Sequence, residues 1–182
     1  MLHKDPLRLM TAVNAVSNMA IAPRRAAAIV ASFRDEGISI LEWVAHHRVL
    51  GFEGIFIYTN DNVDGSEVLL KVLADNAVIS LLLNELGPGT DPPRKCYNHA
   101  LHLFRDLRDY QWALFIDADE FLMLGPRFGH SIARYLREAE ATVGEALSAI
   151  CLHWRWYGSD KAFERTRGCC SSGSSKGTTT CM

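Results

Sequence analysis

The sequence lacks a basic excess, a long apolar run and a leader pattern, and each absence argues against a class of protein. The 182 residues carry 19 Lys and Arg against 21 Asp and Glu, a net charge of −2. A nucleic-acid-binding surface needs a basic excess to neutralise phosphates, so we expect none here. No apolar run approaches the roughly 20 residues that span a bilayer. With no signal-peptide pattern, we expect a cytoplasmic protein, with peripheral membrane association left open.

The sequence also lacks a recognisable pattern of metal-binding or disulfide-forming cysteines. Its five cysteines match no zinc spacing, and their odd number implies no disulfide framework. Cys96 and Cys151 stand among apolar residues, where we expect small core side chains. His46 and His47 are neighbours on an expected helix and diverge by about 100°, so they cannot share one metal ion. A structural role is expected for this histidine pair.

What is present is an alternation of apolar runs and helix patterns between two polar ends. We expect an N-terminal extension of residues 1–25, a globular domain of residues 26–160 and a disordered tail of residues 168–182. Strands are expected at residues 26–33, 54–59, 78–83, 112–116 and 147–154, and helices at 40–50, 66–75, 95–108 and 131–140. Ser39 and Glu42 fit a capping box. This order predicts an α/β fold, a Rossmann-like and mostly parallel sheet with helices on both faces.

The most informative stretch is the apolar run that ends in Asp117, Asp119 and Glu120. The run predicts a strand buried on both faces, and α/β sheets bind ligands beyond the carboxyl ends of their strands. Asp117 and Asp119 point the same way and offer oxygen ligands to Mn²⁺ or Mg²⁺. Three acids there would repel one another without a cation. The alternative is a solvated acidic turn, because 11 Asp give about 0.7 Asp-x-Asp motifs by chance.

Other polar residues follow the expected strands at the same edge of the sheet. Glu36, next to Asp35, fits either a hydrogen bond from a nucleobase or an interaction with a helix dipole. Asn60 and Asp64 fit contacts with a base or ribose, or else ordinary turn formation and helix capping. The sequence alone leaves these alternatives open.

Two further pairs are candidates for ligand contacts. Arg94 and Lys95 begin a helix after a proline-rich loop, and a helix N-terminus with cations suits a diphosphate. An ordinary solvated pair is the alternative. Trp154 and Ser159 lie in an aromatic segment that fits either the core or a cover over a sugar face.

These stretches together resemble family 2 glycosyltransferases, in the branch that also resembles family 92. The resemblance covers about residues 26–160 and lies in FRDEGISILEWVAHHRVLGFEGIFIYTNDNVDGS, KCYNHAL, WALFIDADEF and HWRWYGS. The motifs stand in the same order as in the family, which chance does not easily produce. Two differences are mild: Arg34-Asp35-Glu36 replaces Lys-Asn-Glu, and Tyr157 replaces Phe.

The resemblance implies a GT-A fold and transfer of a sugar from a nucleotide-sugar donor, often a UDP-sugar, to a carbohydrate or glycan acceptor. Asp117 and Asp119 would join a divalent cation, Mn²⁺ or Mg²⁺, to the donor diphosphate. The base, ribose and sugar of the donor would lie near residues that match the family's other motifs: Glu36, Asn60, Asp64 and the segment from Trp154 to Ser159.

The resemblance also predicts a truncated chain. The family continues past the Gly-Ser segment into an acceptor half that usually supplies the catalytic base, whereas here residues 161–167 pass into the Ser/Gly/Thr tail. The base therefore stays unidentified. The alternatives are a non-catalytic nucleotide-sugar-binding protein and a Mg²⁺-dependent nucleotidyl or phosphoryl transferase. Against the transferase, the sequence has no G-x-x-x-x-G-K phosphate loop.

Overall fold

The computed structural model describes residues 22–85, 89, 91–144 and 147–155. The chain divides into two compact units, residues 1–120 and residues 121–182. The expected extension lies almost entirely outside the described residues, and the expected tail lies wholly outside them. The predicted domain boundaries therefore stay predictions.

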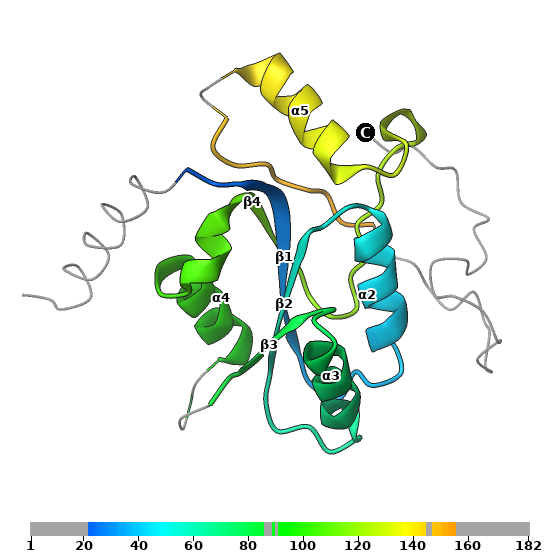
Figure 1. The fold of residues 1–182 in the computed structure, drawn as a ribbon, viewed down its shortest axis with the longest axis vertical. Helices are drawn as coiled ribbons and strands as arrows, with labels where there is room; N and C mark the ends of the chain where they lie inside the picture. The colour runs from blue at the N-terminus through cyan, green and yellow to red at the C-terminus, as the bar shows by residue number, and fades with distance from the viewer. Residues whose placement is uncertain (1–21, 86–88, 90, 145–146, 156–182) are drawn as a thin grey trace, which may run out of the picture. The chain divides into compact units, whose positions relative to one another are not determined.

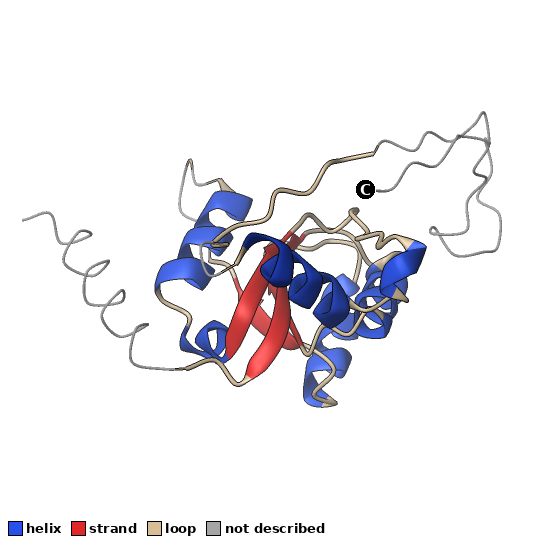
Figure 2. Cartoon of the chain, turned by 90° about the horizontal axis from the view of Figure 1, so that it is seen from above, coloured by secondary structure: helices blue, strands red, loops and turns tan. Residues whose placement is uncertain are grey.

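The first unit is built on a parallel sheet of four strands in the order β3-β2-β1-β4. All three strand pairs are parallel, and the strands lie side by side (Figure 2). The predicted α/β class is confirmed, while the finer GT-A assignment stays a prediction. The strands, with the helices that connect them, are β1 (Arg25–Phe33), α2 (Ile40–Val49), β2 (Gly54–Thr59), α3 (Ser66–Asp75), β3 (Ser80–Leu83), α4 (Pro92–His102), the 3-10 helix Arg105–Asp109 and β4 (Tyr110–Phe115).

The helices cover both faces of this sheet, as predicted. Helices α2 and α3 lie on one face and α4 on the other (Figure 1). This follows from the strand order: right-handed crossovers lead from β1 outward to β3, and α4 then returns the chain to the far side of β1. Strand β1 is central and therefore nearly all buried, which suits its small and branched apolar residues.

Each face of β1 packs against its own helix. Ala28 and Val30 belong to a buried cluster with Cys96 and Ala100 of α4. On the other face, the ring of Phe33 meets Trp43 of α2 edge-on, with 5.2 Å between the ring centroids. The prediction that Cys96 is a core residue is confirmed.

The prediction that the acidic strand is buried on both faces is wrong. Strand β4 pairs only with β1 among the described strands, and Gln111 and Ala113 are exposed. An edge strand has one open side, so a continuous apolar run does not by itself indicate a central position. Because β4 is parallel to β1, its carboxyl end nevertheless lies at the same edge of the sheet as the carboxyl end of β1, as the sequence predicts.

Two helix starts differ from the sequence prediction. Ser39 is the N-cap of α2, but the predicted capping box does not form, since the Ser39 side chain makes no cap bond and both the amide and the hydroxyl of Ser39 donate to the Glu36 carbonyl oxygen, at 3.0 and 3.1 Å. Helix α4 begins at Pro92, earlier than expected, because proline is well tolerated in the first turn of a helix.

The second unit contains one described α-helix, α5 (Ile132–Val143), after the 3-10 helix Pro126–Phe128. The Ser131 hydroxyl accepts a hydrogen bond from the Arg134 amide at 3.3 Å and so caps α5. Residues 147–155 form no strand, so the strand predicted at residues 147–154 is wrong, and Cys151 is exposed rather than in a core. No helix in the described ranges has both the length and the apolar character to cross a membrane.

His47 is a structural residue, as expected for the histidine pair. Its side chain is fully buried, and its Nδ1 lies 2.9 Å from the Trp43 carbonyl oxygen. A carbonyl oxygen only accepts, so Nδ1 must carry the proton. The ring lies against Trp43, with 4.3 Å between the centroids, and against Phe52. Burial lowers the pKa of His47 to about 4, although its hydrogen bond to Trp43 favours the protonated ring.

We expect the free energy of unfolding to fall as the pH drops from about 6.5 to about 4. The unfolded chain binds a proton on His47 near pH 6.5 and the folded chain only near pH 4, so stability is complete above this window. The loss across the window is roughly 3 kcal/mol. Urea unfolding at several pH values measures it. His47→Gln should flatten the slope and exposed His153→Gln should not; equal slopes for all three proteins would contradict the assignment.

Candidate functional site

The acidic turn lies at the point where the sheet reverses its direction of winding. From β1 the chain winds toward β3, whereas β4 lies on the opposite side of β1. In open α/β sheets, ligands bind outside the carboxyl ends of the strands at such a switch point. The amide of Ile116 donates to the Val30 carbonyl oxygen at 3.3 Å, so the turn that follows begins beside the end of β1. The structure thus places Asp117 and Asp119 at the edge that the sequence predicts.

Hydrogen bonds from both faces of the sheet fix the acidic turn. On the α4 face, the Tyr97 hydroxyl lies 3.1 Å from Asp117 Oδ1 and 3.3 Å from the Ile116 carbonyl oxygen. On the α2 face, the indole Nε1 of Trp43 donates to the Glu120 carbonyl oxygen at 2.8 Å. The turn closes on itself, because the Asp117 amide donates to Glu120 Oε2 at 3.0 Å.

The three acids do not converge on one point. Glu120 turns its carboxylate back to the Asp117 amide, whereas Asp117 and Asp119 are exposed on either side of buried Ala118. Asp119 makes no ion pair with any described residue. Within the described ranges, no three His, Cys, Asp or Glu side chains are grouped so that they could hold a metal ion alone. Two exposed carboxylates fit Mg²⁺ or Mn²⁺, which take their remaining oxygens from phosphate and water.

The electrostatics at Tyr97 agree with this geometry. Burial, and next the negative charge of Asp117, raise the pKa of the Tyr97 hydroxyl far above its usual value. The hydroxyl therefore keeps its proton at neutral pH and can donate a hydrogen bond to the Asp117 carboxylate.

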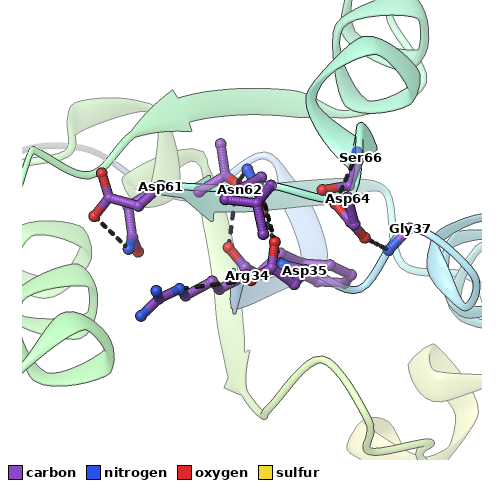
Figure 3. A network of polar contacts seen from close by, with 11 residues as sticks. Arg34, Asp35, Gly37, Asp61, Asn62, Asp64 and Ser66 are labelled. Atoms are coloured by element: carbon purple, nitrogen blue, oxygen red, sulfur yellow. Dashed lines mark hydrogen bonds and ion pairs between the residues drawn. The ribbon is translucent and has the colours of Figure 1, made fainter.

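A second group of polar residues joins the loops that follow β1 and β2 (Figure 3). Asp35, with a positive φ of 57°, receives the Val63 amide on Oδ1 at 2.7 Å and donates its own amide to Asn62 Oδ1 at 2.9 Å. The Gly37 amide donates to Asp64 Oδ2 at 2.8 Å. These three bonds, which we call the loop brace, hold the two loops together.

The Asp64 carboxylate therefore takes part both in the loop brace and in the turn before α3. Besides Gly37, it accepts the Ser66 amide at 2.9 Å, just before α3. The hydroxyl and amide of Ser66, with the Gly37 amide, hold the pKa of Asp64 below its usual range. This is the turn role that the sequence offers as the alternative, although the N-cap of α3 is Gly65 and makes no side-chain cap bond. The predicted ribose contact stays a prediction.

Asn60 and Glu36 lie nearer the sheet. Asn60 is 8% exposed, and its Nδ2 donates to Asp61 Oδ2 at 3.3 Å, but its Oδ1 has no hydrogen-bond partner among the described residues. A buried acceptor without a donor is costly, and a ligand N–H or O–H would satisfy it. Glu36 is half-buried and accepts the Ser39 hydroxyl on Oε2 at 3.3 Å.

The remaining candidates are less closely tied to the edge of the sheet. Arg94 is exposed, and Lys95 Nζ donates to the Glu85 carbonyl oxygen in the preceding loop. Trp154 belongs to the second unit and is 75% exposed. Ser159 lies outside the described residues. The donor-binding roles of all four stay predictions.

Sequence reasoning missed Tyr97 and Trp43. Tyr97 lies 20 positions before Asp117, and Trp43 lies 77 positions before Glu120. Contacts of this range leave no local pattern. The only signal was that right-handed crossovers put one helix on each face of the sheet, so that a polar aromatic side chain on either helix can reach the edge.

Comparison with known proteins adds no relative. The chain matches no family model, no curated protein and no solved structure. The parallel α/β sheet stands on the structure, and the resemblance to family 2 glycosyltransferases stays a prediction based on the sequence motifs.

Proposed function

We propose that the chain binds a nucleotide-sugar donor, most simply a UDP-sugar, with Mn²⁺ or Mg²⁺, and acts as a glycosyltransferase on a carbohydrate or glycan acceptor. The observation that carries the proposal is the exposed pair Asp117 and Asp119 at the carboxyl end of β4, beside the switch point of the sheet. Carboxylate oxygens at such an edge suit a cation that also binds a diphosphate. The motif order of the sequence supports the same reading.

Different residues of the chain would contact different parts of the donor. Asp117 and Asp119 hold the cation, which when bound stabilises the charge that develops on the leaving diphosphate. The side-chain oxygen Oδ1 of Asn60 accepts a hydrogen bond from the base or ribose, next to Glu36. Asp64 acts through the loop brace, which keeps the loops after β1 and β2 in place.

Helix α4 completes the proposed donor site within the first unit. The N-terminal turn of α4 favours binding of the negative diphosphate, and Arg94 adds an exposed positive charge there. Lys95 holds the preceding loop through its hydrogen bond to the Glu85 carbonyl oxygen. For contacts with the sugar, the sequence motifs offer Trp154 and Ser159 as candidates. A carboxylate base would deprotonate the acceptor hydroxyl, and it stays unassigned.

Calorimetric titration with UDP, in the presence and absence of Mn²⁺, tests the proposal. We expect binding that is at least about 10-fold tighter with Mn²⁺, because the carboxylate pair and the diphosphate share the cation. A folded protein that binds UDP equally with and without Mn²⁺ would contradict the cation site. A protein that binds no UDP at all would contradict the donor assignment.

The same preparation separates the alternative functions. Incubation with UDP-sugars should release UDP slowly by hydrolysis, or faster when an acceptor is present. Donor binding with neither transfer nor hydrolysis would indicate a non-catalytic binding protein. Release of pyrophosphate or phosphate from a nucleoside triphosphate would instead indicate a nucleotidyl or phosphoryl transferase.

A further inference from the structure

We propose that Tyr97 is a positioning residue of the cation site, which fixes the carboxylate of Asp117 so that one of its oxygens faces the cation. This inference rests on the proposed function, because it assigns a task within the same site. Among the described residues, Tyr97 provides the only side-chain hydrogen bond to the Asp117 carboxylate. The carboxylate is otherwise exposed at the end of β4.

Helix packing fixes the position of the Tyr97 hydroxyl. The ring lies edge-on to Phe115, the last residue of β4, with 5.3 Å between the centroids. The neighbouring Cys96 is completely buried, and Ala100, one turn further along, is 2% exposed. Together they hold α4 against β1. A tyrosine side chain has only two rotatable bonds before its hydroxyl, so a packed ring leaves the oxygen little freedom.

The hydroxyl contacts two acceptors on one short stretch of chain. It lies 3.1 Å from Asp117 Oδ1 and 3.3 Å from the Ile116 carbonyl oxygen. The hydroxyl has a single proton, which these two acceptors share. The shorter contact, with Oδ1, sets the rotation of the carboxylate, and the longer one places the hydroxyl against the main chain of the turn. Asp117 Oδ2 makes no hydrogen bond within the described part of the chain and is left to face a ligand.

A neutral donor suits this task better than a charged one. A lysine or arginine at the same place would also orient the carboxylate, but its positive charge would repel the cation that Asp117 is proposed to bind. The tyrosine hydroxyl orients one oxygen without adding charge. Groups that orient a metal ligand in this way commonly change metal affinity when they are removed.

The other contacts of the turn do not perform this task. Trp43 bonds to the carbonyl oxygen of Glu120, and Glu120 bonds to the amide of Asp117, so both fix the main chain. Tyr97 adds control of a side chain. Tyr97→Phe also removes the contact with the Ile116 carbonyl oxygen, but the other main-chain bonds of the turn remain, so its main effect should be to free the carboxylate to rotate.

The test is the binding of Mn²⁺ alone to the full chain. The loss of the electron paramagnetic resonance signal of the free ion measures how much Mn²⁺ is bound. Loss of a hydrogen bond to a carboxylate that binds a metal predicts that Tyr97→Phe weakens Mn²⁺ binding roughly 10- to 100-fold. The matched control is Tyr110→Phe, which removes a hydroxyl that receives Arg25 Nη1 at 2.7 Å at the opposite end of β4. It should bind Mn²⁺ like the wild type.

A second measurement separates positioning from general loosening of the fold. Affinity for UDP without Mn²⁺ should be the same in Tyr97→Phe and the wild type, whereas a loosened site would weaken both ligands, and that result would overturn the inference. Unchanged Mn²⁺ affinity in Tyr97→Phe would also overturn it and leave the proposed function standing. If the wild type itself takes up no Mn²⁺, the proposed cation site fails, and the inference fails with it.

Discussion

Asp119→Ala is expected to remove the Mn²⁺-dependent part of UDP binding, a loss of at least about 10-fold in UDP affinity, because it should lower Mn²⁺ affinity by more than about 100-fold. Even groups outside the ligand shell of a metal change its affinity by roughly 10- to 100-fold, so loss of a direct carboxylate ligand should exceed that range. Asp119 is exposed and makes no ion pair with any described residue, so the substitution should leave the fold intact. Calorimetry with UDP and Mn²⁺ measures the affinity, and a thermal melt checks the fold.

The control for Asp119→Ala removes a carboxylate elsewhere on the same unit. Asp75 is exposed on α3, and among the described residues its carboxylate pairs only with Lys71, at i,i+4, with 3.2 Å between Nζ and Oδ2. Asp75→Ala should cost about 0.5 kcal/mol of stability or less and should not change UDP binding. Unchanged Mn²⁺-dependent affinity in Asp119→Ala would refute the cation assignment, whatever else the protein binds.

Trp43→Ala is expected to lower the free energy of unfolding by about 3–5 kcal/mol, the range for removing a large buried aromatic side chain. The Trp43 side chain is completely buried, and its ring contacts Phe33 and His47, with centroid distances of 5.2 and 4.3 Å. Domains of this size are typically stable by about 5–15 kcal/mol, so the loss would be a large share of the total. Urea unfolding followed by circular dichroism measures it.

A matched pair of variants makes the Trp43 result specific. Trp154→Ala changes the same residue type where it is 75% exposed, and it should cost less than about 0.5 kcal/mol. Trp43→Phe keeps an aromatic ring but loses the N–H that donates to the Glu120 carbonyl oxygen, so it should weaken Mn²⁺ binding as well. Equal stability of Trp43→Ala and the wild type would show that the packing around α2 is not as described.

Local sequence signals located most of the first unit. Strand β2 and helix α3 begin and end where the apolar run and the helix pattern predict, and β1 begins one residue earlier than expected. In each case, turn residues stand on both sides of the element. Gly51, with a positive φ of 92° after α2, and Gly65, with 81° before α3, are examples. These signals act over a few residues and need no information about partners.

What failed depends on partners far away in the chain. The apolar run of β4 gives no sign that β1 is its only described neighbour, and residues 147–155 have a strand-like pattern without forming a strand. Sheet pairing is a long-range property, so the same residues pair or stay unpaired according to what lies beside them.

The candidate site also has features that local patterns predict and features that depend on distant partners. Asp117 and Asp119 were predictable, because an acidic pair directly after an apolar run is a local pattern. That Glu120 turns back on the Asp117 amide, and that Asp64 reaches Gly37 in another loop, required the geometry of the turns. Glu36 was predictable only as an acid at the edge of the sheet, and its contact with Ser39 emerged from the structure.

The loop brace implies that one wall of the site is ready before any ligand arrives. The amides of Asp35, Gly37 and Val63 lie in exposed loops, yet each donates to a side chain of the other loop. They should therefore exchange with solvent deuterium more slowly than loop amides usually do. Because three hydrogen bonds already hold the two loops together, a ligand that touches either of them should lose little entropy in ordering the wall. Selectivity on that side would then come from shape and not from induced closure.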